Sequence, residues 1–66
     1  MKNIHERAKE AAQREVQSAK GMVQTWETPK YRAIDIKYNR NTLGVAKERL
    51  AIAEYTLSLF DTAERS

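Results

Sequence analysis

The sequence contains no cysteine, and this absence excludes two classes of protein at once. Disulfide-stapled secreted domains and thiolate metal sites both require cysteine, so neither class applies. Long apolar runs are missing too, since no segment approaches the roughly 20 apolar residues of a membrane-spanning helix. The first residues also lack the apolar stretch of a secretory signal. We therefore expect a soluble cytoplasmic protein without a membrane partner.

Glycine and proline, which interrupt helices and mark loops, are scarce: the 66 residues include 2 Gly and 1 Pro. No linker-like composition, low-complexity tract or internal repeat divides the chain. We expect residues 1–66 to form a single domain. A chain this short buries a small fraction of its surface, so its core alone gives limited stability.

Signatures of catalysis and of bound cofactors are also absent. His5 is the only histidine, and it has neither a second histidine nor a cysteine with which to hold a metal. Ser18 and Ser58 have no histidine at helical spacing that could act as a base. Neither glycine lies in a phosphate-binding loop. We expect no enzymatic activity, no metal and no cofactor.

What the chain does contain is helical periodicity, first over residues 3–26. Apolar residues there follow spacings of 4, 3, 4 and 3, at Ala12, Val16, Ala19, Val23 and Trp26. Such spacing places them on one face of a helix. Asn3 is suited to cap this helix, with Glu6 three residues later. The pattern predicts a helix over about residues 3–26.

Two series of apolar residues with a seven-residue period follow. The first series is Ile36, Leu43, Leu50 and Leu57, and the second is Tyr31, Tyr38, Val45, Ile52 and Leu59. Their unbroken phase predicts one long helix over about residues 29–63, with a kink allowed at residues 39–42 or Gly44. Thr28 can cap this helix, and Pro29 suits its first position. The fold class is thus an all-α, antiparallel helical hairpin with its turn at residues 27–28.

The segment 22–38 also permits β structure. Ile34, Ile36 and Tyr38 alternate with polar residues, and Gly21 could end the first helix. Residues 22–26 and 31–38 would then pair as a β-hairpin, giving an α-β-β-α order. Spacing favours the helical interpretation, and this alternative stays open at the level of sequence.

In a hairpin with its corner at residues 27–28, Ala19 should lie opposite Ile36 and Ala12 opposite Leu43. The first helix would then end before the second, leaving the C-terminal apolar residues uncovered. The two apolar series also lie too far apart on the helix for one partner to cover both. We therefore expect a homodimer that forms a four-helix bundle; a curved monomer with a wide core face is the alternative. The protein interface predicted for the homodimer is Val45, Ile52, Tyr55, Leu57, Leu59 and Phe60.

Asn39 is in phase with Ala46, Ala53 and Phe60 on the predicted long helix. A buried asparagine at such a position can fix the register of a bundle. In a loosely packed bundle, the same residue would be solvated.

A basic and aromatic cluster lies just after the turn. Its members are Lys30, Tyr31, Arg32, Lys37, Tyr38 and Arg40. Cations that bind phosphates, next to rings that stack on bases, are typical of sequence-tolerant nucleic-acid binding. The two tyrosines also belong to an apolar series, which favours burial instead.

The expected function is that of a small, non-catalytic helical interaction protein that self-associates and binds a surface of a larger protein. In architecture, though in no motif, the expected dimer resembles small bacterial plasmid-copy-number proteins that bind RNA hairpins. It is also similar to bacterial and phage regulators that inhibit a larger host enzyme. The alternatives are a basic nucleic-acid-binding regulator that uses the cluster at residues 30–40, and a structural subunit of a larger assembly.

Overall fold

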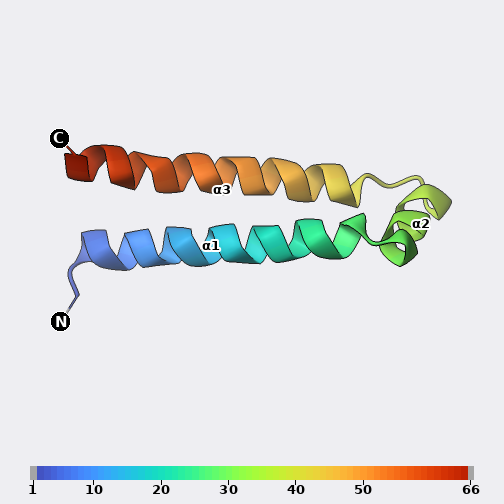
Figure 1. The fold of residues 1–66 in the computed structure, drawn as a ribbon, viewed down its shortest axis with the longest axis horizontal. Helices are drawn as coiled ribbons and strands as arrows, with labels where there is room; N and C mark the ends of the chain where they lie inside the picture. The colour runs from blue at the N-terminus through green and yellow to red at the C-terminus, as the bar shows by residue number, and fades with distance from the viewer. Residues whose placement is uncertain (1, 66) are drawn as a thin grey trace.

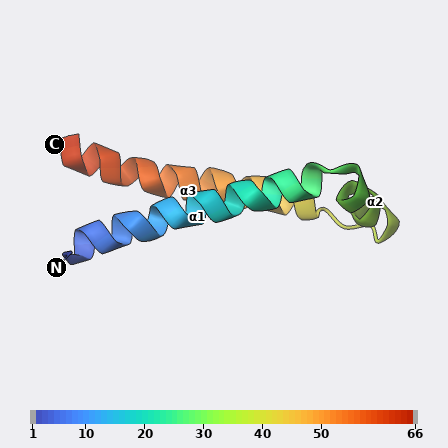
Figure 2. The ribbon, with the colours of Figure 1, turned by 60° about the horizontal axis from the view of Figure 1, so that its bottom comes forward.

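The computed structural model describes residues 2–65, which form three α-helices and no strand. Helix α1 spans Ile4–Glu27, α2 spans Pro29–Lys37 and α3 spans Thr42–Arg65. Figures 1 and 2 show α1 and α3 running antiparallel, with α2 turning the chain at one end and both termini at the other. The predicted all-α helical hairpin is confirmed. The α-β-β-α alternative is wrong for the described residues.

Helix α1 begins and packs as its sequence predicts. The Asn3 side-chain oxygen accepts a hydrogen bond of 2.8 Å from the Glu6 backbone N–H, which caps the first turn. The buried residues of α1 are those of the predicted stripe, Ala12, Val16, Ala19 and Val23. Because their spacing alternates between four and three, they lie on the side of α1 that faces α3.

The corner between α1 and α2 lies at Thr28 and Pro29. Thr28 has an extended backbone, and its hydroxyl donates a 2.7 Å hydrogen bond to the Thr25 carbonyl. Pro29 stands in the first turn of α2, where its missing N–H breaks no helical hydrogen bond. Thr28 is the N-cap residue of α2, as predicted, but its side chain closes α1 and makes no capping hydrogen bond to α2.

The second helix predicted from the sequence is interrupted after Lys37. Asn39 has a φ of 51°, in the left-handed region that asparagine tolerates better than most residues. Its N–H donates to the Ile36 carbonyl at 3.2 Å, and the Arg40 N–H donates to the Asp35 carbonyl at 2.8 Å. These two bonds form a Schellman motif, which ends α2. The expected kink is therefore a complete break between two helices.

This break shows that the single long helix predicted over about residues 29–63 is wrong. The seven-residue phase that joined Tyr31 and Tyr38 to Val45 does not correspond to a single helix, because α2 and α3 are separate elements. Asn39 is exposed in the loop between them and is not part of the α3 stripe, so the bundle-register role considered for it is wrong.

The start of α3 is held by side chains on both sides of the break. Asp35 accepts hydrogen bonds from the Thr42 N–H at 3.2 Å and the Leu43 N–H at 3.1 Å. Asn41 accepts one from the Gly44 N–H at 3.2 Å. A β-carbon on Gly44 would overlap the Asn41 side chain. Three of the N–H groups that a helix leaves unpaired at its start are thereby satisfied.

The core between α1 and α3 is thin because its innermost side chains are alanines. Ala19 and Ala46 are 0% exposed, and within residues 2–65 no large side chain is buried to that degree. Val23 and Leu43 pack against Ala46 near the corner, surrounded by the half-buried Met22, Trp26 and Leu50. Small residues at the contact let the two helices approach closely. They also bury little apolar area, so the contact contributes little hydrophobic stabilisation.

The pairing of the helices differs from the predicted one. The ring of His5 lies 5.4 Å from that of Phe60, and Lys9 Nζ contacts Glu64 at 2.8 Å, so the two long helices run together to their free ends. The predicted contacts of Ala19 with Ile36 and of Ala12 with Leu43 are wrong, because α2 occupies the turn. The predicted overhang of the C-terminal apolar residues is wrong for the same reason.

Candidate functional site

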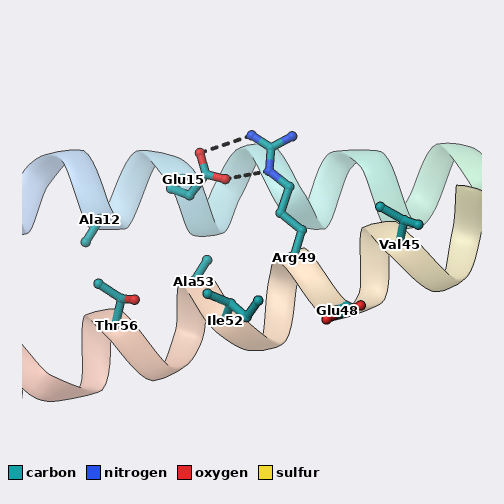
Figure 3. A pocket seen from close by; sticks show the side chains of 8 residues that line it. All are labelled: Ala12, Glu15, Val45, Glu48, Arg49, Ile52, Ala53 and Thr56. Carbon is teal, nitrogen blue, oxygen red and sulfur yellow. Dashed lines mark hydrogen bonds and ion pairs between the residues drawn. The ribbon is translucent and has the colours of Figure 1, made fainter.

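An open groove of about 330 Å³ lies between α1 and α3 along one side of the rod (Figure 3). Ala12 of α1 and Ala53 of α3 both point into the space between the two helices there. The remaining lining residues are Glu15 of α1 and Val45, Glu48, Arg49, Ile52 and Thr56 of α3. The groove exists because small residues face each other where larger ones would have filled the space.

An ion pair crosses the groove. Arg49 Nε donates to one Glu15 carboxylate oxygen at 2.5 Å, and Nη2 donates to the other at 3.1 Å (Figure 3). The hydrogen bonds and charge of Arg49 hold the pKa of Glu15 below its ordinary value, and Glu15 in turn raises the pKa of Arg49. Both side chains are partly open to solvent, so the pair adds little stability. Its effect is to link α1 to α3 across the groove.

The apolar face of the hairpin extends from this groove. On α3, Ile52 and Leu59 follow Val45 at intervals of seven, which keeps them on the groove side. On α1, Ala11, Ala8 and Ile4 precede Glu15 at successive spacings of four, three and four, which places them on the same side of the helix as Glu15. We define the apolar face as Ile4, Ala8 and Ala11 of α1 with Val45, Ile52 and Leu59 of α3.

The opposite side of the hairpin is polar. By the same helical periodicity, it carries Gln13, Lys20 and Gln24 of α1 and Lys47, Glu54 and Asp61 of α3. On the apolar face, by contrast, Val45 is 61%, Ile52 60% and Leu59 51% exposed. The hairpin as a whole is therefore amphipathic across its width.

The structure brings together half of the predicted interface residues. Val45, Ile52 and Leu59 lie in one row on the apolar face, and Tyr55 is exposed beside that row, on the side away from α1. Leu57 and Phe60 are half-buried, and the Phe60 ring packs edge-on against His5. The last two are therefore partly covered within the chain itself.

The free end of the rod is closed by charged groups. The hydrogen bonds of Lys9 hold the pKa of Glu64 below its ordinary value, with a smaller effect from His5, which lies 3.5 Å away. The same contact raises the pKa of Lys9. His5 thus takes part in a terminal contact. Within residues 2–65 no group of three acidic or histidine side chains is arranged to hold a metal.

The six residues predicted for nucleic-acid contact all lie on α2 or within three residues of its end. Tyr31 is half-buried and packs edge-on against Trp26, with ring centroids 5.1 Å apart. Tyr38 is 60% exposed, with Lys37 Nζ 5.5 Å and Arg40 Cζ 5.9 Å from the centre of its ring. One predicted aromatic residue is therefore open to a ligand and the other is packed within the corner.

A second groove, of about 280 Å³, lies where α2 meets the start of α3. Arg32, Arg40 and Lys47 all line it. Lys47 was not among the residues predicted for nucleic-acid contact, because the predicted basic cluster ends at Arg40. The seven-residue spacing from Arg40 to Lys47 is the signal that could have added it to the cluster.

Asp35 is the other residue whose role the sequence did not reveal. Asp35 is 8% exposed, and this burial by itself would raise the pKa of its carboxyl group. Hydrogen bonds from Thr42 and Leu43 lower the pKa and outweigh the effect of burial. Together with the nearby charge of Arg32, they hold the pKa of Asp35 below its ordinary value. Asp35 is therefore the negatively charged cap of α3.

No helix within residues 2–65 combines the length and the apolar character needed to cross a membrane. Comparison of the chain with protein-family models, with curated proteins and with solved structures gave no match.

Proposed function

We propose that this chain is a non-catalytic helical interaction protein of the cytoplasm that pairs with a second copy of itself through the apolar face. The observation that carries the proposal is the row of exposed aliphatic side chains at Val45, Ile52 and Leu59, which borders the groove between α1 and α3. A large aliphatic side chain is worth roughly 1.5 to 3 kcal/mol when it moves from water into a packed interface.

The amount of exposed surface supports this pairing. The chain exposes 5240 Å², whereas a compact monomer of 7.6 kDa is expected to expose about 4300 Å². Its radius of gyration is 15.2 Å, against about 11 Å for a compact domain of this length. The excess of roughly 900 Å² is close to the approximately 800 Å² that each partner buries in an interface of standard size.

The thin core makes such burial valuable. Residues of the α1–α3 contact are mainly alanine and valine, which bury little area. Pairing two hairpins through their apolar faces would give a four-helix bundle with a second, larger apolar layer. Part of the stability of each hairpin would then come from its partner.

The apolar face is suited to contact itself. A two-fold dimer places the same patch of each copy against the other, so a patch needs both projections and a recess. Here the exposed Ile52 and Val45 line the groove together with the buried alanines Ala12 and Ala53. The seven-residue repeat on α3 is the repeat by which helices interlock along their length.

The test is the mass of the protein in solution, measured by sedimentation equilibrium over a range of concentrations. We expect a dimer of about 15 kDa, twice the 7.6 kDa of one chain. The variant Ile52→Gln/Leu59→Gln should shift the equilibrium to monomer by at least about tenfold in dissociation constant, since two exposed anchors are removed.

The matched control is Ile36→Gln/Tyr55→Gln, which also replaces two exposed apolar side chains, 75% and 64% exposed, neither of them on the apolar face. This variant should dimerise nearly as well as the original chain. Equal losses in the two variants would contradict the assignment of the face.

A chain that stays monomeric at high micromolar concentration would overturn the proposal, and the apolar face would then be assigned to a larger protein, the other partner expected from the sequence. A mass that keeps increasing with protein concentration, beyond that of a dimer, would overturn the proposal. The chain would then be assigned as a structural subunit of a larger assembly.

A further inference from the structure

Positive charge is concentrated at the corner of the hairpin. Residues 28–47 contain five cations and one carboxylate, a net charge of +4, while the rest of the chain sums to −1 and the total is +3. The five cations are Lys30, Arg32, Lys37, Arg40 and Lys47. The mild basicity of the whole chain is therefore a property of one end of the rod.

The single carboxylate of the corner does not neutralise its surface. Asp35 is buried, and its two oxygens accept the N–H groups of Thr42 and Leu43. Within residues 2–65, none of the five corner cations forms an ion pair with a carboxylate at 4 Å or less. On the long helices, Lys9 and Arg49 are paired with carboxylates, whereas Arg14 and Lys20 form no such pair within 4 Å. Apart from the longer-range attraction between Arg32 and Asp35, the corner cations are therefore open to an anionic ligand.

These cations surround a recess and an exposed ring. Arg32, Arg40 and Lys47 line the groove of about 280 Å³ at the start of α3. Tyr38 is exposed next to it, within cation–π distance of Lys37 and Arg40. Cations spaced along a groove follow a phosphate backbone, and an aromatic ring offers a surface for stacking a base. An acidic peptide would use the cations but has no base to stack on the ring.

We propose that the α2 corner is a binding site for single-stranded nucleic acid, with phosphates held by Arg32, Arg40 and Lys47 and a base stacked on Tyr38. The site uses no residue of the apolar face. Because α2 lies at the end of the rod opposite both termini (Figure 1), pairing through the apolar face leaves the corner accessible. The two proposals can therefore succeed or fail separately.

The experiment is fluorescence polarisation of a labelled oligothymidylate with the full-length chain. We expect binding at low salt that weakens steeply as salt is added, because each neutralised phosphate contributes about 0.7 to the logarithmic salt slope of a single strand. With three to five phosphates engaged, affinity should fall roughly 20- to 130-fold between about 50 and 200 mM salt.

Two double variants, each of which removes two positive charges, test whether the corner cations bind the strand. Arg40→Gln/Lys47→Gln should weaken binding at least about tenfold at low salt. Arg14→Gln/Lys20→Gln removes two exposed cations from α1, and its binding should change much less. Far-UV circular dichroism establishes that each variant remains helical. If both variants lose affinity equally, net charge alone drives binding and the proposed site is wrong.

The stacking contact has its own test. Tyr38→Ala should weaken oligothymidylate binding roughly fivefold or more, as removal of a base-stacking ring does, whereas Tyr38→Phe should retain it. Inorganic polyphosphate should bind less tightly than the oligonucleotide and be insensitive to Tyr38→Ala. Polyglutamate binding as tight as that of the oligonucleotide would overturn the proposal in favour of an acidic protein ligand. Absence of oligonucleotide binding at low salt and high micromolar protein would overturn it outright.

Discussion

The Asp35 carboxylate accepts the Leu43 backbone N–H at 3.1 Å, although the two residues belong to different helices. A second oxygen of the same carboxylate accepts the Thr42 N–H. One side chain thus joins the last turn of α2 to the first turn of α3. The angle between these helices, and with it the shape of the corner, depends on this residue.

Replacing Asp35 by Ala should lower the melting temperature by roughly 5 to 10 °C, about the loss expected when a helix cap is removed from a domain of this size. Thermal circular dichroism measures the change. Hydrogen exchange should accelerate at the Thr42 and Leu43 amides before it does so in the middle of α3. Glu54→Ala, which removes an exposed carboxylate from the middle of α3, is the control. Equal melting temperatures for the two variants would contradict the capping role.

Acid should destabilise the hairpin. The pKa of Asp35 in the folded chain lies below its ordinary value of 3.8, so the unfolded chain takes up a proton first as the pH falls. The stability contributed by Asp35 is complete above its unfolded pKa and is lost as the pH falls through its folded pKa. We expect the melting temperature to drop below about pH 4, and to drop less in Asp35→Asn.

Glu15 and Glu64 add to this acid dependence, because their pKa values also lie below the ordinary 4.5. Their ion pairs are exposed, so added salt should screen them, whereas the buried Asp35 is screened less. If Asp35→Asn and the original chain show the same pH profile at high salt, the carboxylate of Asp35 does not stabilise the fold as a charged group.

The two glycines should respond oppositely to alanine. Gly21→Ala adds a methyl group with no neighbour within 4 Å, so it should stabilise α1 by about 0.5–1 kcal/mol. Gly44→Ala would displace the Asn41 side chain and remove its hydrogen bond to the Gly44 N–H. We expect Gly44→Ala to be less stable than Gly21→Ala by about 1 kcal/mol in chemical denaturation. In an Asn41→Ala background, where the cap is already lost, Gly44→Ala should become stabilising; persistent destabilisation there would refute the explanation.

Enlarging the fully buried alanine of α3 should separate the long helices. Ala46→Leu should cost about 1–3 kcal/mol, because the added carbons have no space between α1 and α3. Ala51→Leu, at an exposed position of the same helix, should have little effect in urea unfolding. A neutral result for Ala46→Leu would mean that the contact between the helices is looser than its alanines indicate.

The sequence was sufficient to predict α1, its cap and its buried face. Asn3, the alternating spacing from Ala12 to Val23 and the Pro29 corner are local signals, and local signals specify local structure. The two seven-residue series likewise placed Leu43 on the side of the helix that packs against α1 and Ile52 on a different side, which is exposed in the hairpin.

The sequence was insufficient at the break. Residues 39–42 allowed a kink, but the apolar phase continued across them by coincidence, so the complete break at the left-handed Asn39 was not predicted. A nine-residue helix at the turn then shifted the pairing of α1 with α3, which brought Phe60 beside His5. Lys47, by contrast, lies seven residues after Arg40, so helical spacing alone could have placed it beside the basic cluster.

The hydrogen bonds of the corner join residues that are close in sequence, from Ile34 to Val45. Closing a loop of about ten residues takes on the order of 10–100 ns, and a helix elongates in about a nanosecond per residue. The corner can therefore form while α1 is still detached. We expect it to act as the folding nucleus: substitutions at Asp35 should slow refolding, whereas those at Ala19, in the contact formed last, should chiefly accelerate unfolding.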